Sequence, residues 1–120
     1  MSSPFATGLK PPYWAVIFAS QREGRDAGYA AVADRMVELA AQQPGFLGME
    51  STRDAQGFGI TVSYWRSPED IAQWRLNVEH SDARRLGREQ WYRQFELRVA
   101  KVERAYAFER PAARRDAAQP

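Results

Sequence analysis

The stretch FGITVSYWRSPEDIAQW, residues 58–74, changes its pattern halfway along. In its first eight residues, bulky apolar side chains alternate with smaller or polar ones, which predicts a strand with two different faces. One face carries Phe58, Ile60, Val62 and Tyr64, and the other carries Gly59, Thr61, Ser63 and Trp65. Ser67 can then cap a helix that begins at Pro68. The acidic residues that follow suit the positive end of the helix dipole. A strand that leads directly into a helix is therefore expected here.

Similar patterns on either side predict the rest of the fold. Strands are expected at 13–20, 46–54, 58–65 and 95–108, and helices at 26–43, from 67 to about 78, and from about 82 to 93. The order is β-α-β-β-α-β with a broken second helical element, which is typical of an α+β, ferredoxin-like fold: an antiparallel four-stranded sheet with helices on one face. This domain is expected to span 13–108, with a flexible N-terminal segment at 1–12 and a flexible C-terminal tail at 109–120.

A sheet covered on one side leaves its other face in need of a partner. That face would expose several large apolar groups, so a homodimer formed through the open sheet face is expected. Lys101, Glu103 and Arg104 interrupt the last strand. We interpret them as partners in ion pairs with residues such as Glu50 or Arg53, either across strands or across the dimer.

Composition narrows the function further. The 120 residues include 17 basic and 15 acidic side chains, which are interspersed, so no basic face for nucleic acid is expected. There is no cysteine, which excludes disulfides, thiolate catalysis and zinc–sulfur sites, and a single histidine gives no metal-ligand spacing. No apolar run approaches the ~20 residues of a membrane span, and the start lacks the features of a secretory signal. A cytoplasmic protein that needs no membrane is expected.

Five segments together resemble the antibiotic biosynthesis monooxygenase family. They are YWAVIFASQRE, ELAAQQPGFLGMES, GFGITVSYWRSPEDIAQW, EHSDARRLGREQWY and RVAKVERAY, in this order within about residues 13–106. The resemblance implies the ferredoxin-like fold and its dimerisation into an α+β barrel. The family and its relatives include cofactor-independent oxygenases that act on polyketide anthrones and quinols, haem-degrading enzymes, and proteins with no assigned activity. Fold alone does not choose among these functions.

The candidate site lies in the tryptophan-rich region. Trp65, Trp74, Trp91 and Tyr92 could form the walls of a pocket for a planar aromatic ligand, or could simply fill the core. His80 is the candidate general base, and its alternative role is to end a helix. Asn77 or Tyr92 could stabilise an oxyanion, and Arg84 could hold an anionic group of the substrate.

Two functions remain open at this point. The first is a cofactor-independent monooxygenase acting on a small aromatic, phenolic or quinol-like substrate. The second is a non-catalytic dimeric module that binds a ligand or serves in stress, with its aromatics mainly in the core. Haem degradation fits less well. Trp74 can match the tryptophan of the haem-degrading relatives, but their axial histidine falls near Gly87 or Arg88, and their asparagine falls near Gln21.

Overall fold

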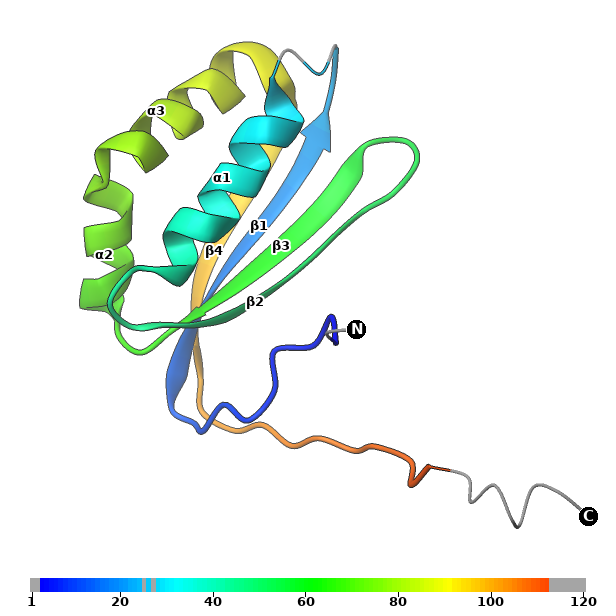
Figure 1. Cartoon of the computed structure of the whole chain (residues 1–120), viewed down its shortest axis with the longest axis vertical. Coiled ribbons are helices and arrows are strands. Elements are labelled where there is room, and N and C mark those ends of the chain that lie inside the picture. Colours follow the sequence, from blue (N-terminus) through cyan, green and yellow to red (C-terminus); the bar gives the residue numbers. More distant parts are fainter. Residues whose placement is uncertain (1–2, 25, 27, 113–120) are drawn as a thin grey trace, which may run out of the picture.

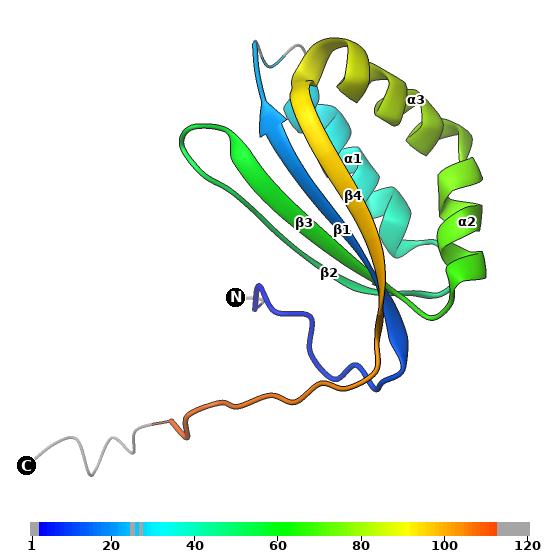
Figure 2. The same ribbon diagram turned by 180° about the vertical axis from the view of Figure 1, so that it is seen from behind.

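The structure, a computed structural model, describes residues 3–24, 26 and 28–112. It confirms the expected α+β fold with one antiparallel four-stranded sheet, whose strand order is β2-β3-β1-β4. The three helices lie on one face of the sheet (Figures 1 and 2). The strands are β1 (Tyr13–Arg22), β2 (Phe46–Arg53), β3 (Phe58–Trp65) and β4 (Tyr92–Val102), and the helices are α1 (Tyr29–Ala41), α2 (Pro68–Leu76) and α3 (Val78–Leu86). A π-helical turn, Gly87–Trp91, joins α3 to β4.

Register assigns each alternating set to one face of the sheet. Val16 pairs with Ser63 and Val99, and Trp65 lies on the same face as Ser63. This face is the covered one, because Trp65 stacks on Trp74 of α2. The opposite, open face carries the more apolar set, and two of its side chains in β3 remain well exposed, Phe58 at 46% and Ile60 at 39%.

The start of α2 confirms the expected cap. Ser67 Oγ accepts a hydrogen bond of 3.1 Å from the amide of Asp70, and Pro68 stands in the first turn, where its missing N–H costs nothing. The third helix was expected to begin near residue 82, but α3 begins at Val78. Asn77 is the reason, because its extended backbone ends α2 and its side-chain oxygen accepts from the amide of His80 (3.1 Å), which caps α3.

The last strand differs from the expected range of 95–108. It begins at Tyr92, directly after the π-helical turn, and ends at Val102. Val102 pairs with Tyr13, the first residue of β1, and the preceding Pro11 and Pro12 have no N–H to continue the ladder. Residues 103–112 therefore run on without a strand partner in the same chain.

The expected ion pairs within the sheet are also wrong. β2 and β4 occupy opposite edges, so residues of β4 cannot reach Glu50 or Arg53 in the same sheet. Glu50 instead accepts hydrogen bonds from the Tyr64 hydroxyl and the Ala6 amide, and Lys101 lies 6.0 Å from the ring centre of Trp14. Ion pairs across a dimer stay a prediction.

The two ends of the chain differ in what they contact. The N-terminal segment reaches the edge strand, where Ala6 lies against Gly48 and hydrogen-bonds Glu50. The part of the expected C-terminal tail beyond residue 112 lies outside the described residues. Among the helices that are described, none has the length and apolar character needed to cross a membrane.

Candidate active site

A cavity of about 500 Å³ lies between the covered face of the sheet and the helices. Most of its wall is apolar, with contributions such as Phe18 from β1, Met36 from α1 and Ile71 from α2. This volume lies within the range of about 300–1,000 Å³ that is usual for ligand pockets. The site therefore offers an apolar space in the middle of the fold.

The cavity opens along the edge strand β4. Leu97 and Val99 line it from that strand, yet their exposed fractions are 52% and 50%. Both point to the covered face, because they pair with Phe18 and Val16 of β1. A half-exposed residue on a covered face indicates a gap in the covering, so the mouth lies beside β4.

His80 lies on the cavity wall in a defined orientation. Its ring stacks on Trp74, with 4.0 Å between ring centres and 12° between the planes. Its Nδ1 lies 3.0 Å from the backbone carbonyl oxygen of Trp74. Because a carbonyl can only accept, Nδ1 carries the proton in the neutral ring, and Nε2 keeps its lone pair. Within the described chain Nε2 has no hydrogen-bond partner, and it is not sealed from solvent.

The surroundings keep this imidazole neutral near pH 7. Burial lowers the pKa of His80 below its usual value, and the hydrogen bond to the Trp74 carbonyl opposes that shift. The positive charges of Arg84 and Arg75 lower the pKa further. A neutral histidine with a free Nε2 can accept a proton, which is the state that a general base needs.

Two tyrosines form a polar region elsewhere on the cavity wall. The Tyr92 hydroxyl donates to the Tyr29 hydroxyl at 3.5 Å, and Arg53 donates to Tyr29 at 3.3 Å. Arg53 is itself held by Ser20 (2.8 Å to Oγ). Burial, followed by the contact with Tyr29, raises the pKa of Tyr92 well above its usual range. Tyr92 therefore stays protonated at neutral pH and can act as a donor but not as a base.

Five of the seven residues predicted from the sequence line this one cavity. They are Trp74, His80, Arg84, Trp91 and Tyr92. Trp91 is nearly buried and presents an edge-on contact to Tyr29, with 5.5 Å between ring centres. Residues from α2, α3, the π-helical turn and β4 thus line the same cavity.

The other two predicted residues lie behind the wall. Trp65 is completely buried and does not line the cavity, because it is enclosed by Phe46 (5.4 Å, edge-on) and Trp74. Its indole nitrogen donates to Ser63 at 2.9 Å. Asn77 is also outside the lining, and its side-chain oxygen is occupied by the cap of α3. Both residues support the positions of Trp74 and His80.

Sequence reasoning missed several lining residues. Tyr29 and Met36 are seven residues apart in α1, a spacing that puts them on one helix face, and that face lines the cavity. Arg53 could have been found by alternation, because it shares the covered face of β2 with Met49 and Ser51. Arg75 and Arg88 carry no sequence signal that separates them from other arginines, since only the folded chain shows their approach to the cavity.

The described residues contain no group of three or more histidine, aspartate or glutamate side chains arranged to hold a metal ion. The polar groups on the cavity wall are one imidazole, two phenols, several guanidinium groups and the hydroxyls of Ser51, Thr61 and Ser63.

Comparison with known proteins agrees with this architecture. A protein of Bacillus subtilis (strain 168), the uncharacterized protein YqjZ, is 54% identical over 100 residues, which cover 83% of this chain and 88% of that protein. Among solved structures, SnoaB from Streptomyces nogalater, a cofactor-independent oxygenase, is similar with a TM-score of 0.68 and 13% identity, over 79% of this chain and 97% of SnoaB. Rv0793 from Mycobacterium tuberculosis is similar with a TM-score of 0.67 and 18% identity, over 78% of this chain and 99% of that chain.

These two structures support the fold alone, because their sequence identities are low. The family assignment comes from residues 12–86, which match the antibiotic biosynthesis monooxygenase family. The matched range includes the parts of the cavity wall that come from β1 to α3, with Trp74, His80 and Arg84 among them. The π-helical turn and β4 lie beyond it. The chain therefore belongs to the antibiotic biosynthesis monooxygenase family.

Proposed function

We propose that this protein is a cytoplasmic, homodimeric monooxygenase that acts without a cofactor on a small aromatic phenol or quinol. The observation that carries the proposal is the orientation of His80. Its Nδ1–H is held by the Trp74 carbonyl, which leaves Nε2 as a proton acceptor on the wall of an apolar cavity. Family membership supports the reaction class, and the reaction itself is argued from the site.

The chemistry begins with transfer of the phenolic proton to Nε2 of His80. The resulting phenolate is rich in electrons and reacts with dioxygen directly. One oxygen atom bonds to the ring carbon opposite the phenolate and becomes a carbonyl oxygen of the quinone product, and the other leaves as water with the single hydrogen that this carbon loses and the phenolic proton returned by His80. The apolar wall excludes bulk water from the anion, and positioning of the ring contributes to the rate.

Tyr92 is assigned the role of oxyanion donor in this proposal. Asn77 was the other candidate, but its side chain caps α3 and lies outside the cavity lining. Tyr92 lines the cavity and stays protonated beside Tyr29 and the positive charge of Arg53, and in this proposal its hydroxyl proton turns from the long 3.5 Å contact with Tyr29 to the substrate oxygen. A fixed neutral donor near a positive charge suits a developing negative oxygen.

Haem fits this site poorly. The axial histidine position of haem-degrading relatives falls near Gly87 or Arg88, and at Gly87 an added Cβ would lie 2.9 Å from the Tyr92 ring. Gly87 is also buried in the π-helical turn. A histidine there would have to displace Tyr92 from the cavity wall, so haem is not a ligand in the proposed reaction.

Oxygen uptake tests this function. Protein treated with a metal chelator is expected to consume one dioxygen per molecule of an anthrone or fused-ring quinol, above the uncatalysed rate and above a heat-denatured sample. Ligand binding without added oxygen uptake would contradict catalysis and favour the alternative, a dimeric ligand-binding module. Oxygen uptake is measured with an oxygen electrode, and the amount consumed is compared with the amount of product determined by chromatography.

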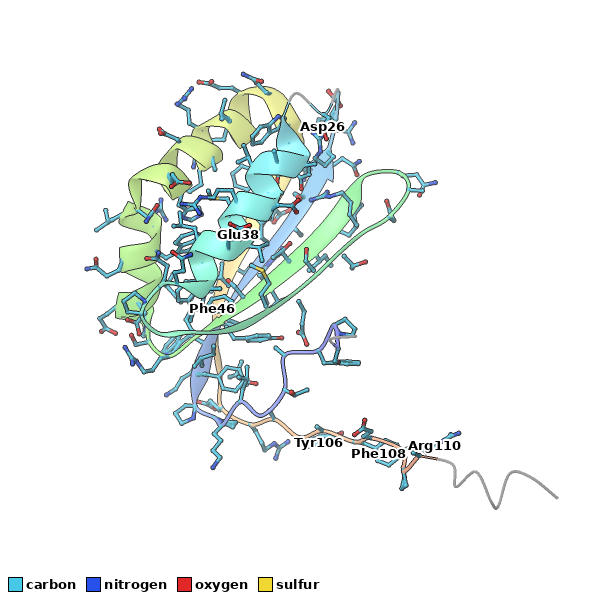
Figure 3. All side chains as sticks on the ribbon, viewed as in Figure 1. Asp26, Glu38, Phe46, Tyr106, Phe108 and Arg110 are labelled. Atoms are coloured by element: carbon cyan, nitrogen blue, oxygen red, sulfur yellow. The ribbon has the colours of Figure 1, made fainter. Side chains whose placement is uncertain are left out.

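The homodimer is proposed to form through the open sheet face. That face carries Phe58, Ile60, Val62 and Tyr64 from β3, opposite the helices. Beyond β4, the extended segment 103–112 leads away from the body of the chain, and its Tyr106 and Phe108 are 96% and 84% exposed (Figure 3). Large aromatics on an extended arm gain most by packing on another surface, and a second copy supplies one.

Placing a charge on that face should separate the two copies. The Ile60→Asp variant is expected to weaken dimerisation about 100-fold or more, because an unpaired charge would be buried at the interface. Sedimentation velocity at several protein concentrations measures the shift. Leu76→Asp is the matched control, since Leu76 is 72% exposed on α2 in the helical layer. Equal behaviour of both variants, with dimers retained, would refute this interface.

A further inference from the structure

Three arginines of the helical wall make no contact that neutralises their charge. Arg75, Arg84 and Arg88 all line the cavity, and none of their guanidinium groups forms an ion pair or hydrogen bond with the described part of the chain. Other arginines are paired: Arg35 with Glu79 at 2.8 Å and Arg85 with Glu89 at 3.0 Å. Two further arginines of the described chain without such a partner, Arg104 and Arg110, lie in the extended segment beyond β4 and do not line the cavity.

Gathering these charges is unfavourable in the empty protein. Burial lowers the pKa of the Arg84 guanidinium, and the nearby charges of Arg75 and Arg88 lower it further. Arg84 is the half-buried member of the three, and the other two are exposed. Such a cluster is stabilised by an anion placed among the three groups, because each guanidinium then gains a charge-assisted partner.

The position of the cluster decides what that anion is attached to. Arg84 follows His80 by four residues on α3, so the two side chains lie on one helix face with Cβ atoms about 5–6 Å apart. Across the mouth stand the apolar Leu97 and Val99 of β4. Arginine and histidine on one side, and apolar side chains on the other, suit a ligand with a planar apolar body and one anionic substituent.

We propose that the ligand of this cavity is an aromatic carboxylate, whose fused rings occupy the apolar space and whose carboxylate is bound by Arg84, with Arg75 and Arg88 beside it. This inference rests on the proposed function, and it narrows the substrate from phenols in general to phenols that carry a carboxylate. A guanidinium binds a carboxylate through two parallel N–H···O hydrogen bonds, which also orients the ring.

The same contact affects the base. The charges that face His80 are Arg75 from α2 and Arg84 from α3, and both lower its pKa. Glu79, its neighbour in the chain, is already paired with Arg35 of α1. A bound carboxylate offsets the two positive charges, so the pKa of His80 rises on binding. The carboxylated substrate would therefore make its own base stronger.

A pair of probes separates this proposal from its alternatives. 6-Hydroxy-2-naphthoate and 2-naphthol share rings and hydroxyl and differ in the carboxylate. We expect the naphthoate to bind about 10- to 100-fold more tightly by calorimetry in anaerobic buffer, where no turnover occurs. Arg84→Gln should abolish that preference, because it weakens binding of the naphthoate far more than binding of 2-naphthol. Arg85→Gln, which alters the adjacent but paired arginine, should keep the preference.

Each outcome decides a different point. Equal affinity for the two probes, or equal losses in the two variants, overturns the carboxylate site and leaves the proposed function intact. Failure of both probes to bind overturns the proposed function as well. Because the chain has one histidine, its imidazole resonances give a second readout: the pKa should rise with the naphthoate and not with 2-naphthol. An unchanged pKa with bound naphthoate would contradict contact with Arg84.

Discussion

Replacing His80 with glutamine is expected to lower the turnover of a phenolic substrate by about 100- to 10,000-fold, with little change in its binding. Glutamine is similar in length, and its polar amide takes the place of Nε2 of the native imidazole. What it lacks is a lone pair basic enough to take the phenolic proton. The measurement is the initial rate of oxygen uptake, with the dissociation constant measured separately without oxygen.

The pH profile gives this prediction a second observable. Because burial lowers the pKa of His80, the imidazole is neutral and competent as a base at pH 7. Activity should fall only as the pH drops below about 6.5, with a midpoint under that value in the free enzyme. The glutamine variant should lose this acidic limb. If activity still falls at acidic pH in the variant, a group other than His80 causes that fall.

The acidity of the substrate supplies the control. A phenol whose own pKa lies below 7 is already ionised in the assay and needs no base. His80→Gln should therefore change the turnover of such a substrate little, whereas the turnover of a weakly acidic phenol should fall by the full expected factor of about 100 to 10,000. If both phenols lose activity equally, His80 positions the ring and does not remove the proton.

Replacing Trp65 with alanine is expected to lower the free energy of unfolding by about 3–5 kcal/mol. The side chain is completely buried between Phe46 and Trp74, so truncation leaves a cavity that its aromatic neighbours cannot fill. It also removes the donor to Ser63. Urea unfolding at one fixed protein concentration measures the change, since the proposed dimerisation would make stability depend on concentration.

Two variants test whether this loss comes from packing. Trp65→Phe keeps an aromatic ring and should cost less than the alanine variant. Leu76→Ala removes an exposed apolar side chain and should change the free energy of unfolding by no more than about 0.5 kcal/mol. A loss below about 1 kcal/mol in Trp65→Ala would show that the core rearranges around the gap.

Local sequence signals were sufficient where neighbours in the chain decide the structure. The alternation in β3 and the Ser67 cap of α2 depend on residues a few positions apart, and both are confirmed. Alternation does not say which face the helices cover, however. It also does not say how closely a side chain is packed: Trp65 was expected on a cavity wall and does lie on the covered face, but Phe46 and Trp74 enclose it.

The site residues show the same limit. Asn77 caps α3, a role that can be recognised only once the break between α2 and α3 is located. The cap occupies its side-chain oxygen, so this oxygen faces the amide of His80 and not a substrate. The proton position on His80 depends on a carbonyl six residues earlier. Arg84 and Arg85 are adjacent in sequence, yet one is unpaired at the cavity and the other is paired with Glu89. Such differences come from tertiary packing.

The two faces of the edge strand β4 serve different properties of the protein: which molecules enter the cavity, and the proposed dimerisation. Its alternate residues Leu97 and Val99 form the lip of the cavity, while Arg98 and Ala100 face away from it, next to Ile17 and Ala15 of β1. Mutations at every second position can therefore alter which molecules enter the cavity without changing the open face that we propose for dimerisation. A gene duplicate could acquire a new substrate through this strand in single steps, with His80 and its tautomer preserved.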